Sequence, residues 1–158
     1  MADRESVFAE IETAWGPISV WEFSNFLYLF RAAYAAASDL LRQSEWPLLA
    51  TDGPELEGFL VALRHRLPTY GPREIVHLAS KPLPEELTIL DLSRRNPVHI
   101  EFGGLATALV AAVILSGGSL KLGPIRAKLP PIGTGIAALR EAFGRKPTRR
   151  GKGSRGVQ

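Results

Sequence analysis

Nineteen consecutive residues without a charged side chain, 102–120, constrain the fold of this chain more than any other feature. A membrane-spanning helix needs about 20 mostly apolar residues, so this run lies at the lower limit for a span. Glycine, serine, threonine and alanine dilute it, and its strongly apolar part, 105–115, is only eleven residues long. That length is more typical of a buried helix. We therefore predict a buried helix over 104–116, and membrane association through 102–120 is the alternative.

Small side chains recur every four residues within this segment, at Gly104, Ala108, Ala112 and Ser116. Residues four apart lie on one face of a helix, and a face of small side chains lets a second backbone approach closely. The pattern suits packing inside a domain and association between copies equally well. It places Gly104, Ala108 and Ala112 among the predicted interaction residues.

The clearest helix start in the chain lies at Ser19, which precedes Glu22 with the spacing of a capping box. Apolar residues then follow at steps of three and four, which predicts a helix over 20–43 with a broad apolar stripe. Some large side chains fall partly off that stripe, so the helix packs on two sides or also meets a partner. The predicted interaction residues of this helix are Trp21, Phe26, Tyr28 and Leu29.

The remaining pattern predicts one compact α+β domain over 1–144, with about four helices and a small, mostly antiparallel sheet. Residues 98–102 alternate apolar and polar side chains, as a half-buried strand does. The segment 74–79 is too short for periodicity to separate a strand from a helix. The other predicted strands cover 6–13, 87–93, 120–122 and 125–129, and the other predicted helices begin near 53 and 133.

The formal charge of +3 hides two oppositely charged parts. Residues 145–158 hold six of the 19 basic side chains and no acid, so residues 1–144 carry 13 basic against 16 acidic side chains. The last fourteen residues are also poor in apolar side chains, which predicts a disordered tail that attracts nucleic acid or another anionic partner. A solubilising tail without a dedicated partner is the alternative. The predicted anion-binding residues are Arg94 and Arg95, in a loop between strands, and Arg145, Lys146, Arg149, Arg150, Lys152 and Arg155.

Most catalytic chemistry lacks its sequence pattern in this chain. There is no cysteine, which excludes disulfides, thiolate metal sites and cysteine nucleophiles. No phosphate-binding loop or nucleophile elbow is recognisable, and we predict no cofactor and no metal. His99 and Glu101 lie two apart on one predicted strand, with His77 as a third candidate, but two ligands at strand spacing are a weak metal signal.

These observations favour a non-enzymatic protein-interaction module that self-associates through helical faces, as a homo-oligomer or with another protein. A membrane-associated protein using 102–120 is the second hypothesis, and a small enzyme or metal site around His99 and Glu101 is the third. The N-terminus lacks the basic start and apolar run of a secretory signal, so we expect a cytoplasmic protein.

Overall fold

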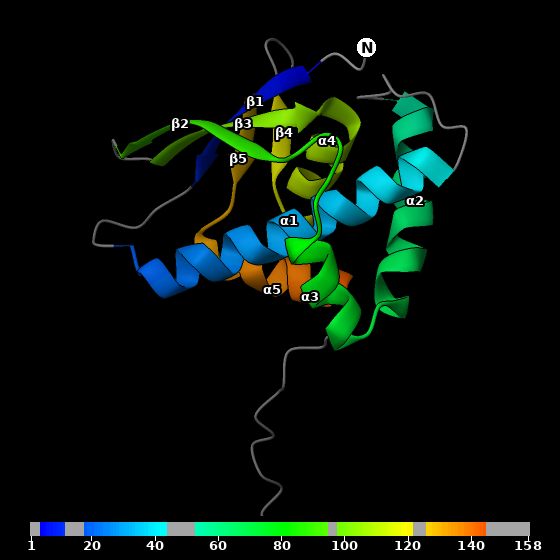
Figure 1. Cartoon of the computed structure of the whole chain (residues 1–158). Coiled ribbons are helices and arrows are strands. Elements are labelled where there is room, and N and C mark those ends of the chain that lie inside the picture. Colours follow the sequence, from blue (N-terminus) through cyan, green and yellow to red (C-terminus); the bar gives the residue numbers. More distant parts are fainter. Residues whose placement is uncertain (1–3, 12–17, 44–52, 95–97, 122–125, 145–158) are drawn as a thin grey trace, which may run out of the picture.

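The computed structural model describes residues 4–11, 18–43, 53–94, 98–121 and 126–144 (Figure 1). Within these residues it confirms the α+β class. In chain order the elements are β1 (Arg4–Ile11), α1 (Val20–Gln43), α2 (Gly53–Arg66), a 3₁₀ turn (Leu67–Thr69), α3 (Pro72–Ser80), β2 (Thr88–Arg94), β3 (Val98–Leu105), α4 (Ala106–Leu115), β4 (Ser119–Lys121), β5 (Arg126–Leu129) and α5 (Ile132–Ala142).

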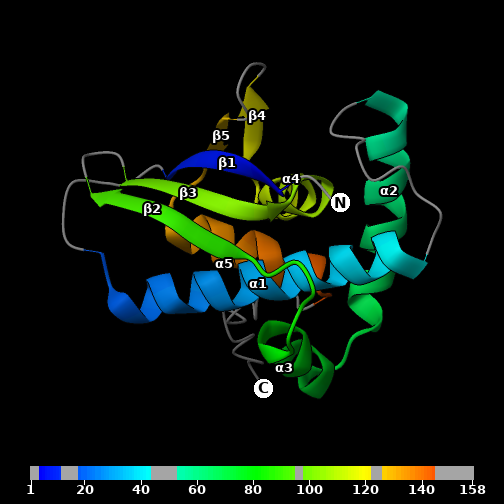
Figure 2. The same cartoon turned by 45° about the horizontal axis from the view of Figure 1, so that its top comes forward.

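The five strands form one mixed sheet in the order β2-β3-β1-β5-β4. All neighbours are antiparallel except β1 and β5, which run parallel. Helices α1 and α5 lie against one face of the sheet (Figure 2). On β1, β3 and β5 the side chains of that inner face are buried and apolar, and those of the outer face alternate with them. The inner face includes Val7, Ala9, Ile11, Val98, Ile100, Phe102, Ala127 and Leu129.

Helix α1 joins the sheet to the other helices. Phe30 is fully buried and stacks on Phe102 of β3 with 4.8 Å between ring centroids, and Phe26 lies 5.6 Å from Phe30. Its middle turns hold buried alanines, which let α4 pack closely beside it. The expected helix over 20–43 is confirmed with the same bounds.

The uncharged run 102–120 is divided between a strand, a helix and a second strand. Strand β3 continues to Leu105, because Gly103 and Gly104 pair with Ser6 and Glu5 of β1. Helix α4 therefore starts at Ala106, two residues later than expected, and ends at Leu115. Pairing with β1 is a long-range contact that local spacing does not reveal. No helix among the described residues is long and apolar enough to cross a membrane.

The fifth helix, α3, lies where the sequence left strand and helix open. Pro72 occupies its first turn, and its buried residues, Ile75, Leu78 and Ala79, have helical spacing. This helix raises the count from the expected four to five. Gly144 follows α5 with a φ of +78°, the left-handed conformation that favours glycine just after a helix, so this glycine is a local sequence signal for the helix end.

A polar network fixes the segment after α3 onto α1. The guanidinium of Arg31 donates two hydrogen bonds to the Glu86 carboxylate, both 2.9 Å, and others to the carbonyl oxygens of Leu78 and Lys81. Lys81 in turn forms an ion pair with Asp39 of α1. Arg31 thus ties Leu78, near the end of α3, and the following residues Lys81 and Glu86 to α1 through four hydrogen bonds.

The Arg31–Glu86 pair makes part of the stability dependent on pH. The hydrogen bond from Arg31 holds the pKa of Glu86 below its ordinary value. A carboxyl group with a lowered folded-state pKa contributes stability above its unfolded pKa and loses it as the pH falls through the folded pKa. We expect Glu86→Gln to destabilise the protein at neutral pH by at most about 1 kcal/mol, since Glu86 is 41% exposed, and to have a smaller effect in acid.

Urea unfolding of wild type and variant at neutral and acidic pH measures this difference. Glu57→Gln, an exposed carboxylate on α2, is the matched control and should leave the pH profile unchanged. A Glu86→Gln effect that grows on acidification would contradict the assignment.

Candidate interaction surface

Large apolar side chains stay exposed at two neighbouring places, the edge strand β2 and the first turn of α1. On β2 these are Ile89, Leu90 and Leu92, which are 43%, 58% and 51% exposed. On α1 they are Val20 and Trp21, which are 80% and 72% exposed. Together with their half-buried neighbours they define a surface that we call the edge surface: Ile18, Val20, Trp21, Phe23, Ile89, Leu90 and Leu92.

A hollow of about 190 Å³ joins the two halves of the edge surface. It is lined by Ile18, Val20 and Phe23 from the start of α1 and by Leu92 and Val98 from the sheet. All five side chains are apolar. The start of α1 is held in place by its cap, since the Glu22 amide donates to Ser19 Oγ at 3.3 Å. The cap thus positions Ile18 and Phe23 beside β2.

An irregularity in β2 explains why it exposes apolar groups on both faces. The register with β3 shifts between Ile89 and Asp91, so that Leu90 is an extra residue. Leu90 leans over Gly103, where an added Cβ would lie 3.0 Å from its Cδ1. Ile89 and Leu92 stand opposite Phe102 and Ile100, and so belong to the inner face.

Strand β2 lies at one end of the strand order and pairs only with β3 among the described residues (Figure 2). An edge strand offers unpaired backbone N–H and C=O groups to another strand, and natural proteins usually protect such edges with lysine, proline or very short strands. This strand has seven residues and contains neither proline nor lysine. Its protecting features are the bulge at Leu90 and the charged residues Asp91 and Arg94.

The structure separates the interaction residues expected from the sequence into exposed and buried ones. Trp21 belongs to the edge surface. Tyr28 is 37% exposed but borders a different hollow, of about 330 Å³, together with residues of α3 and α5. The other five are buried within this chain, although Leu29 also borders the hollow beside Tyr28: Phe26, Leu29, Gly104, Ala108 and Ala112.

The expected small-residue face is buried because α1 and α4 pack on each other. Ala108 and Ala112 are fully buried in α4, so neither is open to a partner. Gly104 belongs to β3 and lies against Tyr34 of α1. At Gly104 the close approach expected from the small side chains is present, but the segment that approaches is helix α1 of the same chain.

Sequence reasoning missed Val20, Ile89, Leu90 and Leu92. The adjacent apolar pair Ile89-Leu90 was the available signal, because neighbouring residues of a regular strand point to opposite faces and only one of them can face a one-sided core. A strand with one covered face must therefore expose one of them or bulge, and this strand does both.

The polar residues expected at a metal or catalytic site lie on the outer face of the sheet. His99 Nδ1 is 3.6 Å from Glu10 Oε1 of β1, and Glu101 lies two residues further along β3. His77 lies on α3, which packs on α1, so it does not join them. Among the residues that the structure describes, no group of three or more side chains could hold a metal ion. The geometry thus gives His99 and Glu101 a solvated polar strand face.

The expected anion-binding residues lie mostly outside the described residues. Arg94 ends β2, but its side chain is not described. Arg95 and the tail residues Arg145, Lys146, Arg149, Arg150, Lys152 and Arg155 belong to the ranges 95–97 and 145–158, which the structure does not describe. Their predicted role stays a prediction.

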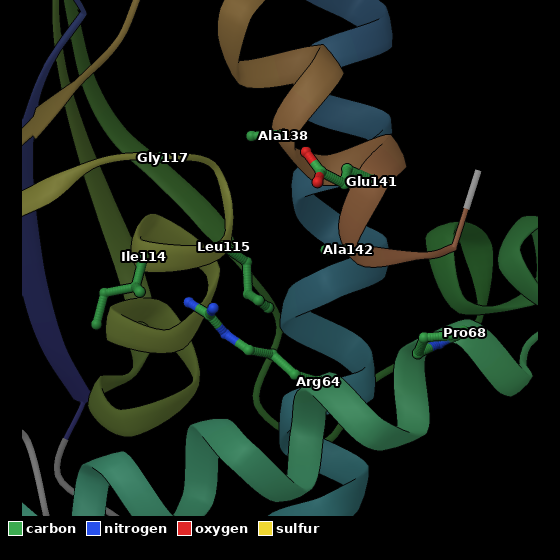
Figure 3. Close-up of a pocket in the computed structure, with 8 residues that line it drawn as sticks. All are labelled: Arg64, Pro68, Ile114, Leu115, Gly117, Ala138, Glu141 and Ala142. Carbon is green, nitrogen blue, oxygen red and sulfur yellow. The ribbon is translucent and has the colours of Figure 1, made fainter. Parts of the chain in front are cut away.

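A larger hollow of about 410 Å³ lies between α2, α4 and α5 (Figure 3). Its lining is mostly apolar, with Arg64 and Glu141 as the charged groups. In Figure 3 the guanidinium of Arg64 points toward the last turn of α4, near Ile114 and Leu115. A cation near the carboxyl end of a helix is favoured by the negative end of the helix dipole.

No family model, no curated protein and no solved structure matches this chain. The structure itself defines an α+β protein with one helix-covered sheet face and an apolar sheet edge.

Proposed function

We propose that this chain is a non-enzymatic protein-interaction module that self-associates through the edge surface. The observation that carries the proposal is that exposed apolar side chains from the start of α1 (Val20) and from the edge strand β2 (Leu92) line one hollow together. Scattered exposed apolar residues are normal, but contiguous ones beside an open strand edge are typical of a protein–protein contact.

Trp21 is the expected anchor of this contact. Tryptophan is enriched among the residues that dominate binding energies, because burying its large ring removes much apolar area from water. It is 72% exposed in the first turn of α1, where it makes little contribution to the core. Binding a partner would remove from water the apolar area of Trp21 that folding leaves exposed.

The hollow favours a protein partner over a small-molecule ligand. Small-molecule sites usually enclose about 300–1,000 Å³ and include a few polar groups that orient the ligand. The hollow of the edge surface is about 190 Å³ and is lined by five apolar side chains. Its size suits one aliphatic side chain of a partner.

Self-association gives a direct test. We expect the wild-type chain to form a reversible homo-oligomer in analytical ultracentrifugation, and Trp21→Ser to raise its dissociation constant at least about tenfold, as loss of a central anchor does. Val61→Ser is the matched control, because Val61 is 56% exposed on α2 and away from the edge surface.

The control should associate like wild type, and circular dichroism should show that both variants stay folded. A wild-type chain that sediments as a monomer at every accessible concentration would refute the proposal. Equal effects of the two variants would show that association does not use the edge surface.

A further inference from the structure

We infer that the hollow between α1, α3 and α5 binds a small monocarboxylate with an apolar body. This inference goes beyond the proposed self-association, because it concerns a different surface and a different class of ligand. The hollow measures about 330 Å³, within the range of about 300–1,000 Å³ that small-molecule sites usually enclose. It is bordered by Tyr28 and Leu29, two predicted interaction residues that do not belong to the edge surface.

The hollow lies where α3 and α5 both pack on α1 but have little contact with each other (Figure 1). Residues three and four positions apart are neighbours on a helix surface. The lining residues of α1 and α3 have that spacing, so each helix turns one face to the hollow: Asn25, Tyr28 and Leu29, and Pro72, Ile75 and Val76. Arg140 and Phe143, at the end of α5, close the third side.

The apolar part of the lining provides a place for the body of the ligand. Leu29, Ile75 and Phe143 are buried, whereas Val76 is 55% exposed although it lines the same hollow. A body of aromatic or aliphatic carbon would cover Val76 and remove apolar area from water, which favours binding.

The polar part of the lining selects a negative head group. Asn25, Tyr28 and Arg140 can each donate hydrogen bonds, and none of their side chains makes a hydrogen bond or an ion pair within the part of the chain that the structure describes. Among the lining residues, all of them described, Arg140 alone carries a charge. One guanidinium matches a ligand with one negative charge, and its flat fork pairs with a carboxylate through two parallel hydrogen bonds.

Helix dipoles do not change this sign, because they oppose each other at the hollow. α3 begins at Pro72, and its positive amino end favours an anion, whereas α5 ends beside the hollow with its negative carboxyl end. Glu22, Glu74 and Glu141 belong to the same three helices, but none of them lines this hollow, and Glu141 lines the one in Figure 3. Arg140 therefore sets the charge that the ligand must have.

Three probes with one body and different head groups test this choice of ligand. Phenylacetate, phenylacetamide and phenethylamine share a phenyl ring and carry a negative, a neutral and a positive head group. We expect phenylacetate to bind the full chain with a dissociation constant at least about tenfold lower than that of phenylacetamide, and phenethylamine to bind most weakly, because charge-assisted hydrogen bonds are the stronger ones. NMR titration of the backbone amides measures the three constants. Equal constants for the first two probes, or no binding of phenylacetate, would overturn the inference.

Arg140→Gln locates the head group. We expect this variant to lose the advantage of phenylacetate and to bind phenylacetamide as the wild type does. Arg64→Gln is the matched control, because it makes the same change of charge on α2, in the hollow of Figure 3. A loss in Arg64→Gln instead of Arg140→Gln would place the ligand in that other hollow and contradict the inference.

Val76→Trp locates the body of the ligand. The new indole ring would occupy the space of the phenyl ring, so we expect both phenylacetate and phenylacetamide to bind at least about tenfold more weakly. Val76 is exposed, so the variant should fold, which circular dichroism checks. Val61→Trp, at a side chain 56% exposed on α2, is the matched control and should bind like wild type. Unchanged binding in Val76→Trp would show that the ligand lies elsewhere.

The outcomes for this hollow are independent of the proposed self-association. Trp21→Ser should leave the affinity for phenylacetate unchanged, and Arg140→Gln should leave self-association unchanged. A monomeric wild type that binds phenylacetate through Arg140 would refute the proposed function alone. If Arg140→Gln weakens self-association and phenylacetate does not bind, the hollow receives an acidic side chain of another copy, and the small-molecule site is wrong.

Discussion

Replacing Gly104 with alanine is expected to lower the free energy of unfolding by about 2–6 kcal/mol, since overpacking a core and breaking a buried hydrogen bond each cost about 1–3 kcal/mol. An added Cβ would lie 2.7 Å from the hydroxyl oxygen of Tyr34 and 3.1 Å from its Cζ. Tyr34 cannot move away freely, because it is fully buried and its hydroxyl makes two hydrogen bonds. It accepts from the Leu105 amide at 2.9 Å and donates to the Glu85 carbonyl at 2.7 Å.

Urea unfolding at a fixed protein concentration measures the loss, and Gly133→Ala is the matched control. An added Cβ at Gly133 meets nothing within 4 Å, and alanine is the better helix former, so this variant should be neutral or slightly more stable. Tyr34→Phe tests the cause, because it removes the atom nearest to the new Cβ. The cost of Gly104→Ala should be smaller in the Tyr34→Phe background than in the wild type, and equal costs would contradict the proposed clash.

Gly104 also shows what the sequence can and cannot predict about this fold. Local signals were sufficient for α1, whose capping box and periodic stripe predict its bounds, and for the glycine at the end of α5. The start of α4 was predicted too early, because the pairing of Gly103 and Gly104 with β1 depends on residues almost a hundred positions away. The need for a small residue at 104 was visible in the sequence, but its partner, Tyr34, was not.

The candidate surface was predicted only in part for a similar reason. A helical stripe shows which residues share a face, but not whether another part of the chain covers that face. The width of the α1 stripe was real, and it is covered by α4, α3 and α5, with Phe30 stacked on Phe102 of the sheet. Trp21 is left exposed because it precedes these contacts. The exposed leucines of β2 depend on a bulge, and the bulge depends on the register with β3.

Helix α1 therefore contributes residues to both the edge surface and the core. Its first turn carries Val20 and Trp21, and its middle holds Phe30 against the sheet. A variant that loosens the middle of α1 should weaken self-association as well as stability, because the hollow needs the start of α1 to stay beside β2. A variant of an exposed edge residue should weaken association alone.

Phe30→Ala is expected to lower the free energy of unfolding by about 3–5 kcal/mol, the usual cost of removing a buried phenylalanine ring. Phe30 is fully buried, and its ring stacks on Phe102 and lies beside Phe26. The cavity that alanine leaves is therefore lined by apolar side chains, and water does not stabilise such a cavity. A loss of this size is a large fraction of the roughly 5–15 kcal/mol that stabilises a typical domain.

Phe8→Ala is the matched control, since Phe8 is the same residue type but is 46% exposed on the outer face of the sheet. It should change the unfolding free energy by less than about 1 kcal/mol, because surface substitutions usually have small effects. If both variants lost the same unfolding free energy, both faces of the sheet would have to be covered. If Phe30→Ala lost less than about 1 kcal/mol, α1 would not pack on β3 through this ring. The expected contrast follows because, in the part of the chain that the structure describes, Phe30 packs on the buried inner face of the sheet whereas Phe8 lies on its exposed outer face.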